Sequence, residues 1–164
     1  MLLTVDIGNT TVAVAGFVGE RPAFLRRLPA GREEGPRDWA AALRALLAGA
    51  CPFRGAALSS VVPALTGPVA DALACVTGGR VLTVGRDTPT GLPLGDYDGA
   101  ALGMDRVVDC VAARARYAPP LAVFDMGTAT TLSVVDREGV FRGGMILAGL
   151  SLSLDALSAR AAPL

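Results

Sequence analysis

Short apolar runs separated by turn residues open the chain and predict three β-strands. The runs cover residues 1–6 (MLLTVD), 11–17 (TVAVAGF) and 22–28 (PAFLRRL), and most of their side chains are apolar. The segments between them are short and contain Gly8 or Gly19, as hairpin turns do. We therefore expect three consecutive antiparallel strands.

From Asp38 onward the apolar residues follow the three- and four-residue spacing of an amphipathic helix. Asp38 is expected to cap a helix that Gly49 ends. Strands are then predicted over 55–62 and 80–84. Helices are predicted over 66–76, with Pro68 in the first turn and Gly78–Gly79 beyond the end, and over 102–117. A loop rich in glycine, proline and aspartate separates the last strand from the last helix.

At residue 121 the pattern begins again. Strands are predicted over 121–125, 131–136 and 139–145, followed by a helix over 150–161. The order β-β-β-α-β-α-β-α is that of the ribonuclease-H-like fold, and β-β-β-α is its first half. We therefore expect an α/β protein with a duplicated ribonuclease-H-like (actin-like ATPase) fold. The first domain would span residues 1–118, and the first half of the second domain residues 119–164.

Composition excludes several classes of function. The net charge is zero and no basic run occurs, so a nucleic-acid surface is not expected. No apolar run approaches the roughly 20 residues of a membrane span, and no signal peptide is recognisable, so we expect a cytoplasmic protein with no membrane partner. The chain has no histidine and its 15 basic residues are all arginine. The absence of lysine excludes a P-loop kinase.

Three cysteines, Cys51, Cys75 and Cys110, are too scattered for a metal site. They also cannot all pair with one another, because their number is odd. We expect them to be buried thiols in a reducing compartment.

Two similar turns carry the candidate chemistry. DIGNTT (6–11) and DMGTATT (125–131) each join the first two strands of a copy. Gly8 and Gly127 are expected to adopt positive φ angles and to expose backbone N–H groups, which can hold phosphate oxygens without a lysine. The hydroxyl groups expected to assist them belong to Thr10, Thr11, Thr128, Thr130 and Thr131.

The leading aspartates of the two turns, Asp6 and Asp125, would repel phosphate directly. A cation that bridges each carboxylate to the phosphates is therefore expected. A single turn of this kind is ordinary hairpin chemistry. Two turns at corresponding positions instead favour a nucleotide tail held between two facing hairpins.

A third motif, GMDR (103–106), lies at the start of a predicted helix. Asp105 is either the N-cap of that helix or a general base for a substrate hydroxyl, and the helix N-terminus would stabilise its negative charge. Arg106 is either a surface charge or a bidentate partner for a substrate carboxylate. In RGGMILAGL (142–150), the glycines either allow close approach to a ligand or mark the change from strand to helix.

Taken together, five motifs resemble the type III pantothenate kinase family over essentially the whole chain. They are DIGNT, SSVVP (59–63), GMDR, DMGTATT and GGMILAG. The family belongs to the actin/hexokinase/Hsp70-like phosphotransferase superfamily, which implies two ribonuclease-H-like domains. The implied activity transfers the γ-phosphate of ATP to the hydroxyl of pantothenate, giving 4'-phosphopantothenate in the first step of coenzyme A biosynthesis. The family is typically a homodimer.

The resemblance also implies roles for single residues. The segment implied to bind ATP comprises Asp6, Ile7, Gly8, Asn9, Thr10, Thr11, Val12 and Ala13. Thr128 resembles a further ATP contact, and Asp125 resembles the ligand of a monovalent cation, K⁺ or NH₄⁺; Mg²⁺ accompanies ATP. The residues implied to bind pantothenate are Tyr97, Gly103, Met104, Asp105 and Arg106. Of these, Asp105 resembles the proton acceptor.

The chain departs from the family pattern at two points. Ala148 stands where the family usually has proline. The family also continues past a helix resembling SLSLDALSARAAPL into further strands and helices, so residues 121–125 are expected to form an exposed apolar edge strand. The chain is then a fragment, a protein completed by a second polypeptide or by strand exchange, or a natural truncation of low activity.

Two other functions stay open. The first is a non-catalytic nucleotide-binding or regulatory protein, similar to a transcriptional accessory factor and inactive because of the missing C-terminal part. The second is a sugar or acetate kinase of the same superfamily. The GMDR and SSVVP segments favour pantothenate over sugars.

Overall fold

The computed structural model describes residues 1–31, 38–50 and 52–160. Its contacts divide the chain into two compact units, Met1–Gly85 and Arg86–Leu164. Each unit has its own sheet and its own hydrophobic core. Among the described residues, no helix has the length and apolar character needed to cross a membrane.

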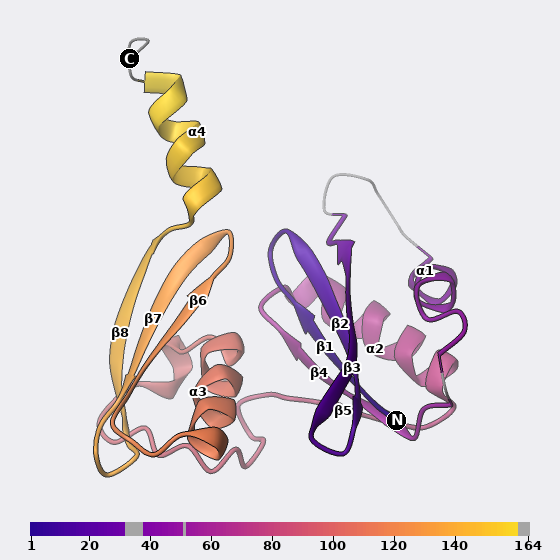
Figure 1. The fold of residues 1–164 in the computed structure, drawn as a ribbon, viewed down its shortest axis with the longest axis horizontal. Coiled ribbons are helices and arrows are strands. Elements are labelled where there is room, and N and C mark those ends of the chain that lie inside the picture. Colours follow the sequence, from indigo (N-terminus) through magenta and orange to yellow (C-terminus); the bar gives the residue numbers. More distant parts are fainter. Residues whose placement is uncertain (32–37, 51, 161–164) are drawn as a thin grey trace. The chain divides into compact units, whose positions relative to one another are not determined.

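The first unit is built on a five-stranded mixed sheet (Figure 1). Its strands are β1 (Leu2–Ile7), β2 (Thr11–Val18), β3 (Arg21–Pro29), β4 (Gly55–Ser60) and β5 (Arg80–Thr83). They lie in the order β3-β2-β1-β4-β5. The first three strands are antiparallel, whereas β4 runs parallel to β1 and β5 parallel to β4. This is the ribonuclease-H-like topology that the element order predicts.

Helices α1 (Trp39–Leu46) and α2 (Pro63–Thr77) pack on one face of the first sheet. Because side chains alternate along a strand, Leu3, Val5 and Ile7 of β1 point to that face, where all three are buried. Trp39 of α1 joins the same core. The core of the first unit therefore lies between this face and the two helices.

The helix ends confirm part of the sequence prediction. Asp38 caps α1, since its Oδ1 accepts a hydrogen bond from Ala41 N–H at 2.9 Å. Gly78, with a φ angle of +61°, ends α2 in the left-handed conformation. The predicted start of α2 is wrong, because the helix begins at Pro63. Pro68 therefore lies inside the helix rather than in its first turn.

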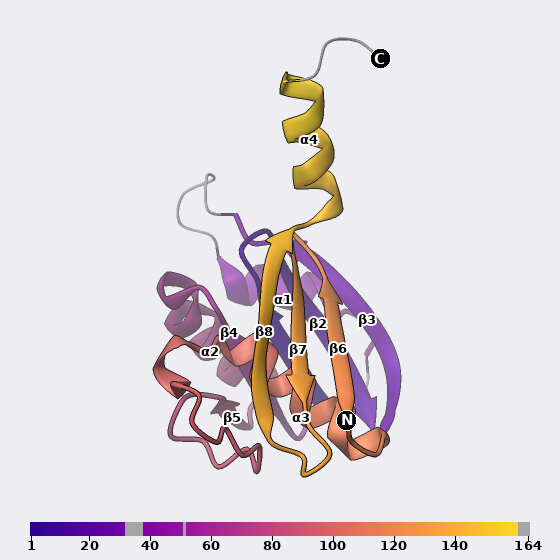
Figure 2. The ribbon, with the colours of Figure 1, turned by 90° about the vertical axis from the view of Figure 1, so that its left-hand side faces the viewer.

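The second unit contains a three-stranded antiparallel sheet, with strands β6 (Leu121–Met126), β7 (Ala129–Val135) and β8 (Phe141–Ala148) side by side (Figure 2). A short 3₁₀ turn, η1 (Gly99–Ala101), precedes helix α3 (Met104–Arg116). Helix α3 covers one face of the sheet, where Val107 and Cys110 pack with Val135 and Phe141.

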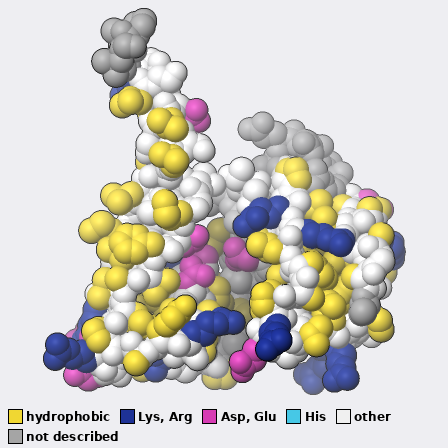
Figure 3. All heavy atoms as spheres, in the orientation of Figure 1, with side chains coloured by type: hydrophobic (Ala, Val, Ile, Leu, Met, Phe, Trp, Pro, Cys, Tyr) yellow, Lys and Arg dark blue, Asp and Glu magenta, His cyan; other side chains and the backbone are white. Residues whose placement is uncertain are grey.

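Helix α4 (Leu150–Arg160) follows β8 and completes the predicted β-β-β-α order. It projects beyond the end of β8 in Figures 1 and 2, and all its residues are exposed. Figure 3 shows hydrophobic side chains along this helix. The predicted last residue of the helix, Ala161, lies outside the described residues.

The division into compact units differs from the predicted domain boundary after residue 118. That boundary follows the order of elements and assigns α3 to the first domain. The boundary after Gly85 follows packing, because α3 contacts β6 and β7 of the second unit. Arg106 and Val107 of this helix are buried with Cys110, a spacing that fits one helical face.

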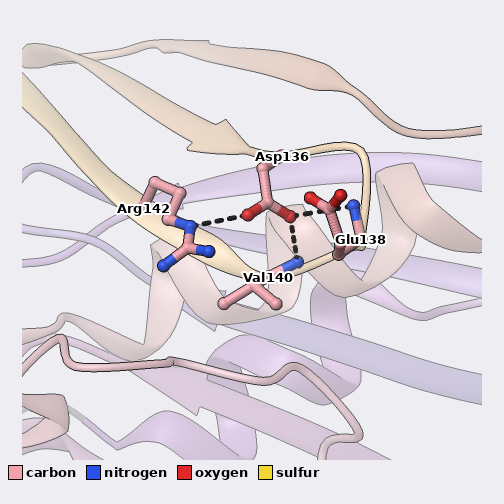
Figure 4. Close-up of polar contacts among 4 residues, drawn as sticks. All are labelled: Asp136, Glu138, Val140 and Arg142. Carbon is pink, nitrogen blue, oxygen red and sulfur yellow. Dashed lines mark hydrogen bonds and ion pairs between the residues drawn. The ribbon is translucent and has the colours of Figure 1, made fainter.

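The turn between β7 and β8 is organised by one carboxylate (Figure 4). Asp136 accepts hydrogen bonds from Val140 N–H at 2.8 Å, from Glu138 N–H at 3.0 Å and from Arg142 Nε at 2.6 Å. These bonds, above all that from Val140 N–H, hold the pKa of Asp136 below its ordinary value. The ionised carboxylate therefore stabilises this hairpin.

The cysteine prediction is confirmed at one position. Cys110 is buried, and burial raises the pKa of its thiol. Cys75 is exposed, and Arg44 Nη2 lies 2.9 Å from its sulfur, so the prediction of a buried thiol is wrong there. Cys75 lies on α2, and its side chain is not among the buried ones of this helix, such as Val69 and Leu73. Cys51 falls outside the described residues.

Candidate functional site

The first candidate turn connects β1 to β2 through Gly8, Asn9 and Thr10. Gly8 N–H donates to Thr11 O at 2.9 Å and closes the turn. Asp6, Asn9, Thr10 and Thr11 are exposed. The turn therefore presents a carboxylate, an amide and two hydroxyl groups at the end of two inner strands of the first sheet.

Two residues of the predicted ATP-binding segment do not contribute side chains to this surface. Ile7 and Val12 pair with each other across the hairpin, and both are fully buried in the core of the first unit. Ala13 pairs with Asp6 on the opposite face and is half-buried. Ile7 and Val12 therefore fix the position of the turn.

The second candidate turn connects β6 to β7 and is one residue shorter. Met126 pairs with Thr130, and Gly127 N–H donates to Ala129 O at 3.0 Å. Asp125 and Thr128 are exposed. This turn therefore also presents a carboxylate and a hydroxyl, although its backbone geometry differs from that of the first turn.

The expected role of the two glycines is wrong in two respects. Neither Gly8 nor Gly127 has a positive φ angle. Their N–H groups are also not exposed donors, because each donates within its own turn. The sequence shows that glycine is present, but the hydrogen bond that closes the turn decides how the backbone runs.

The predicted hydroxyl groups differ in exposure. Thr10, Thr11 and Thr128 are exposed, Thr130 is half-buried and Thr131 is buried. Thr131 pairs with Asp125 and points to the α3 face of the second sheet. Its hydroxyl is therefore placed inside the second unit rather than at the turn.

The GMDR segment forms the start of α3, and the N-cap residue is Gly103. The structural interpretation of Asp105 as the N-cap is therefore wrong. Asp105 lies in the first turn of the helix, half-buried, and its Oδ1 lies 2.8 Å from Arg106 N. Its carboxylate is thus placed where the helix dipole favours negative charge.

Arg106 is not a surface charge, because only 6% of the residue is exposed. Its Nε donates to Ser133 Oγ at 3.0 Å, and its Nη2 donates to Leu132 O at 2.9 Å. The guanidinium also lies over the Phe141 ring, 5.5 Å from the centroid. Arg106 therefore joins the start of α3 to the second sheet.

Tyr97 lies beside the same aromatic ring. Its ring meets that of Phe141 edge to face, with centroids 4.9 Å apart. Tyr97 and Phe141 line an open cavity of about 240 Å³ with Leu94, Asp96 and Arg142. The structure thus places Tyr97 and Arg106 on the same aromatic ring, that of Phe141.

The glycines of RGGMILAGL allow close approach to groups of the chain itself. A Cβ atom at Gly144 would collide with Leu132 O and would lie 2.7 Å from Arg106 Nη2. A Cβ atom at Gly149 would collide with Gly127 O. Gly144 therefore makes room for the buried guanidinium, and Gly149 makes room for the second candidate turn.

Sequence reasoning missed one polar residue of the first unit. Ser59 of the SSVVP segment is buried, and its hydroxyl has no hydrogen-bond partner among the described residues. It pairs with Asp6 in the parallel ladder between β1 and β4. A polar residue at the end of an otherwise apolar strand is the signal that could have identified it.

The family model of type III pantothenate kinase matches residues 2–164 of the chain. The chain is 40% identical to the type III pantothenate kinase of Rubrobacter xylanophilus and 42% identical to that of Rhodospirillum centenum. Both alignments cover 100% of this chain. They cover 64% and 65% of the two relatives, so the chain spans a little less than two thirds of their length.

Among solved structures, the chain is similar to the ethanolamine utilization protein EutJ from Carboxydothermus hydrogenoformans, with a TM-score of 0.53. The alignment covers 98% of this chain and 57% of that protein, at 17% sequence identity. At this identity the similarity shows the fold alone, and it supports the duplicated ribonuclease-H-like architecture.

Proposed function

The chain belongs to the type III pantothenate kinase family, and we propose that its activity is transfer of the ATP γ-phosphate to the hydroxyl of pantothenate. The product would be 4'-phosphopantothenate, the first intermediate on the way to coenzyme A. The family match over residues 2–164 carries this proposal. The two exposed Asp-x-Gly turns support it, because they supply phosphate-binding groups in a chain without lysine.

ATP contacts the first turn through the segment from Asp6 to Ala13. The groups that reach the phosphates are the side chains of Asn9, Thr10 and Thr11 and the turn backbone, since Ile7 and Val12 are buried. Thr128 of the second turn supplies a further ATP contact. Phosphoryl transfer needs mainly positioning and charge neutralisation, which such groups provide.

Magnesium fits the first turn through a single carboxylate. No cluster of three or more acidic, cysteine or histidine side chains suited to a metal occurs in residues 1–31, 38–50 and 52–160. Magnesium in phosphotransferases takes its remaining ligands from substrate phosphates and water, so one exposed aspartate, Asp6, suffices. When bound, the ion neutralises charge on the transferred phosphoryl group. Asp125 would hold K⁺ or NH₄⁺, which also prefer oxygen ligands.

Asp105 is the proposed proton acceptor for the pantothenate hydroxyl. It lies in the first turn of α3, near the positive end of the helix dipole, and such a base accepts the proton late in the transfer. Tyr97, Gly103, Met104 and Arg106 form the rest of the pantothenate segment. Arg106 contributes by holding the helix start on β7, because two of its N–H groups are already used there.

Three finer features of the function belong to the same proposal. They are stimulation by a monovalent cation, assembly as a homodimer and a cytoplasmic location. The relatives described above favour the kinase over the regulatory alternative, because they are named for that activity.

The proposal is tested by incubating the chain with ATP, Mg²⁺, K⁺ and pantothenate and measuring 4'-phosphopantothenate by mass spectrometry. Asp105→Asn is expected to lower the rate by about 10²–10⁴, the usual effect of removing a general base. Asp98→Asn is the matched control, since Asp98 is exposed and caps η1, a role that asparagine also fills. Full activity of Asp105→Asn would overturn the assignment.

The cation site is tested with Asp125→Ala in the same assay. Loss of the carboxylate is expected to abolish stimulation by K⁺ and to weaken ATP binding. An unchanged K⁺ dependence would contradict the role of Asp125.

A further inference from the structure

Ser59 is a buried hydroxyl whose hydrogen-bonding capacity is unused. Only 7% of the residue is exposed, and its Oγ has no partner among the described residues. A buried hydroxyl without a partner is costly, so native proteins rarely keep one without a ligand or water to satisfy it. The neighbouring Ser60 shows the contrast, because its Oγ contacts Val62 and Thr66 at 2.9–3.2 Å.

The sheet register places Ser59 next to Asp6. The two residues pair in the parallel ladder of β1 and β4, so their side chains point to the same face of the sheet. Neighbouring strands are separated by about 4.8 Å, a distance that one bound water or ion can bridge. This face lies opposite the helices α1 and α2, since Val5 and Leu58 of the same ladder point into the core.

The chemistry of the pair fits a hydrated cation. Asp6 is exposed and supplies a carboxylate oxygen, whereas Ser59 supplies a neutral oxygen that both accepts and donates hydrogen bonds. Magnesium keeps several of its waters when it binds a protein carboxylate and substrate phosphates, and those waters need acceptors. An aspartate beside an unused hydroxyl supplies one ligand and one acceptor.

We propose that Ser59 binds the hydrated magnesium ion of the nucleotide, accepting a hydrogen bond from a magnesium-bound water at Asp6. The inference rests on the proposed binding of ATP at the first turn. It adds a residue of β4 to the segment from Asp6 to Ala13. Ser59 is a positioning residue, because it acts through the water rather than on the reacting atoms.

The test measures binding of ADP by calorimetry with Mg²⁺ and again with EDTA. Ser59→Ala is expected to weaken binding of Mg-ADP about 10-fold, the effect of losing one hydrogen bond to a charged group, and to leave binding of ADP in EDTA unchanged. The melting temperature without nucleotide should stay the same or rise, because an unsatisfied hydroxyl is removed. Ser60→Ala is the matched control, and it should lower the melting temperature while keeping the gain in affinity from Mg²⁺.

The outcomes separate the two levels of the proposal. If the unmodified chain binds no Mg-ADP, the proposed function fails and the role of Ser59 fails with it. If the unmodified chain binds Mg-ADP and Ser59→Ala binds it equally well, only the role of Ser59 is overturned. A lower melting temperature with unchanged affinity would show that Ser59 is structural.

Discussion

The two sheets place corresponding side chains in opposite environments. Alignment of Asp6 with Asp125 matches Val5 with Phe124, each directly before the aspartate. Val5 is buried beneath the helices of the first unit, whereas 62% of Phe124 is exposed. The next match follows the same rule, since Ile7 is fully buried and 77% of Met126 is exposed.

The difference arises from the helices that cover each sheet. Helices α1 and α2 pack on the Val5 face of the first sheet. In the second sheet α3 covers the other face, to which Val123 and Val135 point. Helix α4 corresponds to α1 in the element order, but all its residues are exposed. Strand alternation therefore shows which residues share a face, but not whether a helix covers it.

The uncovered face of the second sheet is apolar and continuous across its strands. The register places Phe124 and Met126 of β6, Val134 of β7, and Met145 and Leu147 of β8 on this face, and all five are exposed. Strand β6 is the edge of this sheet among the described residues, which confirms the predicted exposed edge. Exposed apolar faces of this kind are typical of surfaces that other polypeptide segments cover.

The largest expected effect compares the two faces directly. Leu3→Ala removes a fully buried side chain and should lower the free energy of unfolding of the first unit by about 2–5 kcal/mol. Urea unfolding followed by the fluorescence of Trp39, the single tryptophan, measures this loss. Trp39 lies in the first unit, so Phe124→Ala is followed by far-ultraviolet circular dichroism. It should change the free energy of unfolding of the second unit by less than about 0.5 kcal/mol, as exposed positions do. A loss at Phe124 as large as that at Leu3 would show that its face is covered.

The second prediction concerns the shorter turn. In the first unit Ala30 N–H donates to Thr10 O, and in the second unit Gly149 N–H donates to Thr128 O. Gly149 therefore occupies the place in the second unit that Ala30 occupies in the first. A Cβ atom at position 149 would collide with Gly127 O, and Gly149→Ala should cost about 1–3 kcal/mol in circular-dichroism melts.

Gly85 provides the control for that substitution. It follows β5, its φ angle is not positive, and no atom beyond its chain neighbours lies within 4 Å of the point that a Cβ atom would occupy. Gly85→Ala should therefore change the free energy of unfolding by less than about 0.5 kcal/mol. Tolerance of alanine at position 149 would mean that the second turn is as open as the first.

The smallest expected effect is the response of the β7–β8 hairpin to acid. The folded pKa of Asp136 is lowered, so its stabilising contribution is complete above the unfolded pKa of about 4 and is lost as the pH falls through the folded value. Asp136→Asn should be less stable than the unmodified chain near neutral pH, and the difference should shrink as the pH is lowered below about 4. Hydrogen exchange of the β7–β8 hairpin measures the stability of the variant and of the unmodified chain at each pH. A stability difference that does not change with pH would contradict the role given to the ionised Asp136 carboxylate.

The element order could be predicted from the sequence because it depends on local patterns. The Asp38 cap and the left-handed Gly78 are short-range features, and both were predictable for that reason. The burial of Arg106 could not be predicted, because its partners Leu132 and Ser133 lie on another strand. A charged residue early in a helix gives no signal of such partners.

The candidate site was predictable at the level of motifs and less so at the level of atoms. Repetition of Asp-x-Gly identified both turns, and each joins the first two strands of its sheet as expected. The backbone of Gly8 and Gly127 was not predictable, since the closing hydrogen bonds depend on turn length. Ser59 was missed because its unused hydroxyl is evident only from three-dimensional packing.

The central claim is that both Asp-x-Gly turns bind the phosphates of ATP, and hydrogen exchange with a non-hydrolysable Mg-ATP analogue tests it most directly. Residues 6–13 and 125–131 should exchange more slowly with the analogue present, while the β2–β3 turn at Gly19 and the β7–β8 turn at Asp136 keep their rates. Unchanged exchange at residues 6–13 and 125–131 under saturating analogue would contradict the claim.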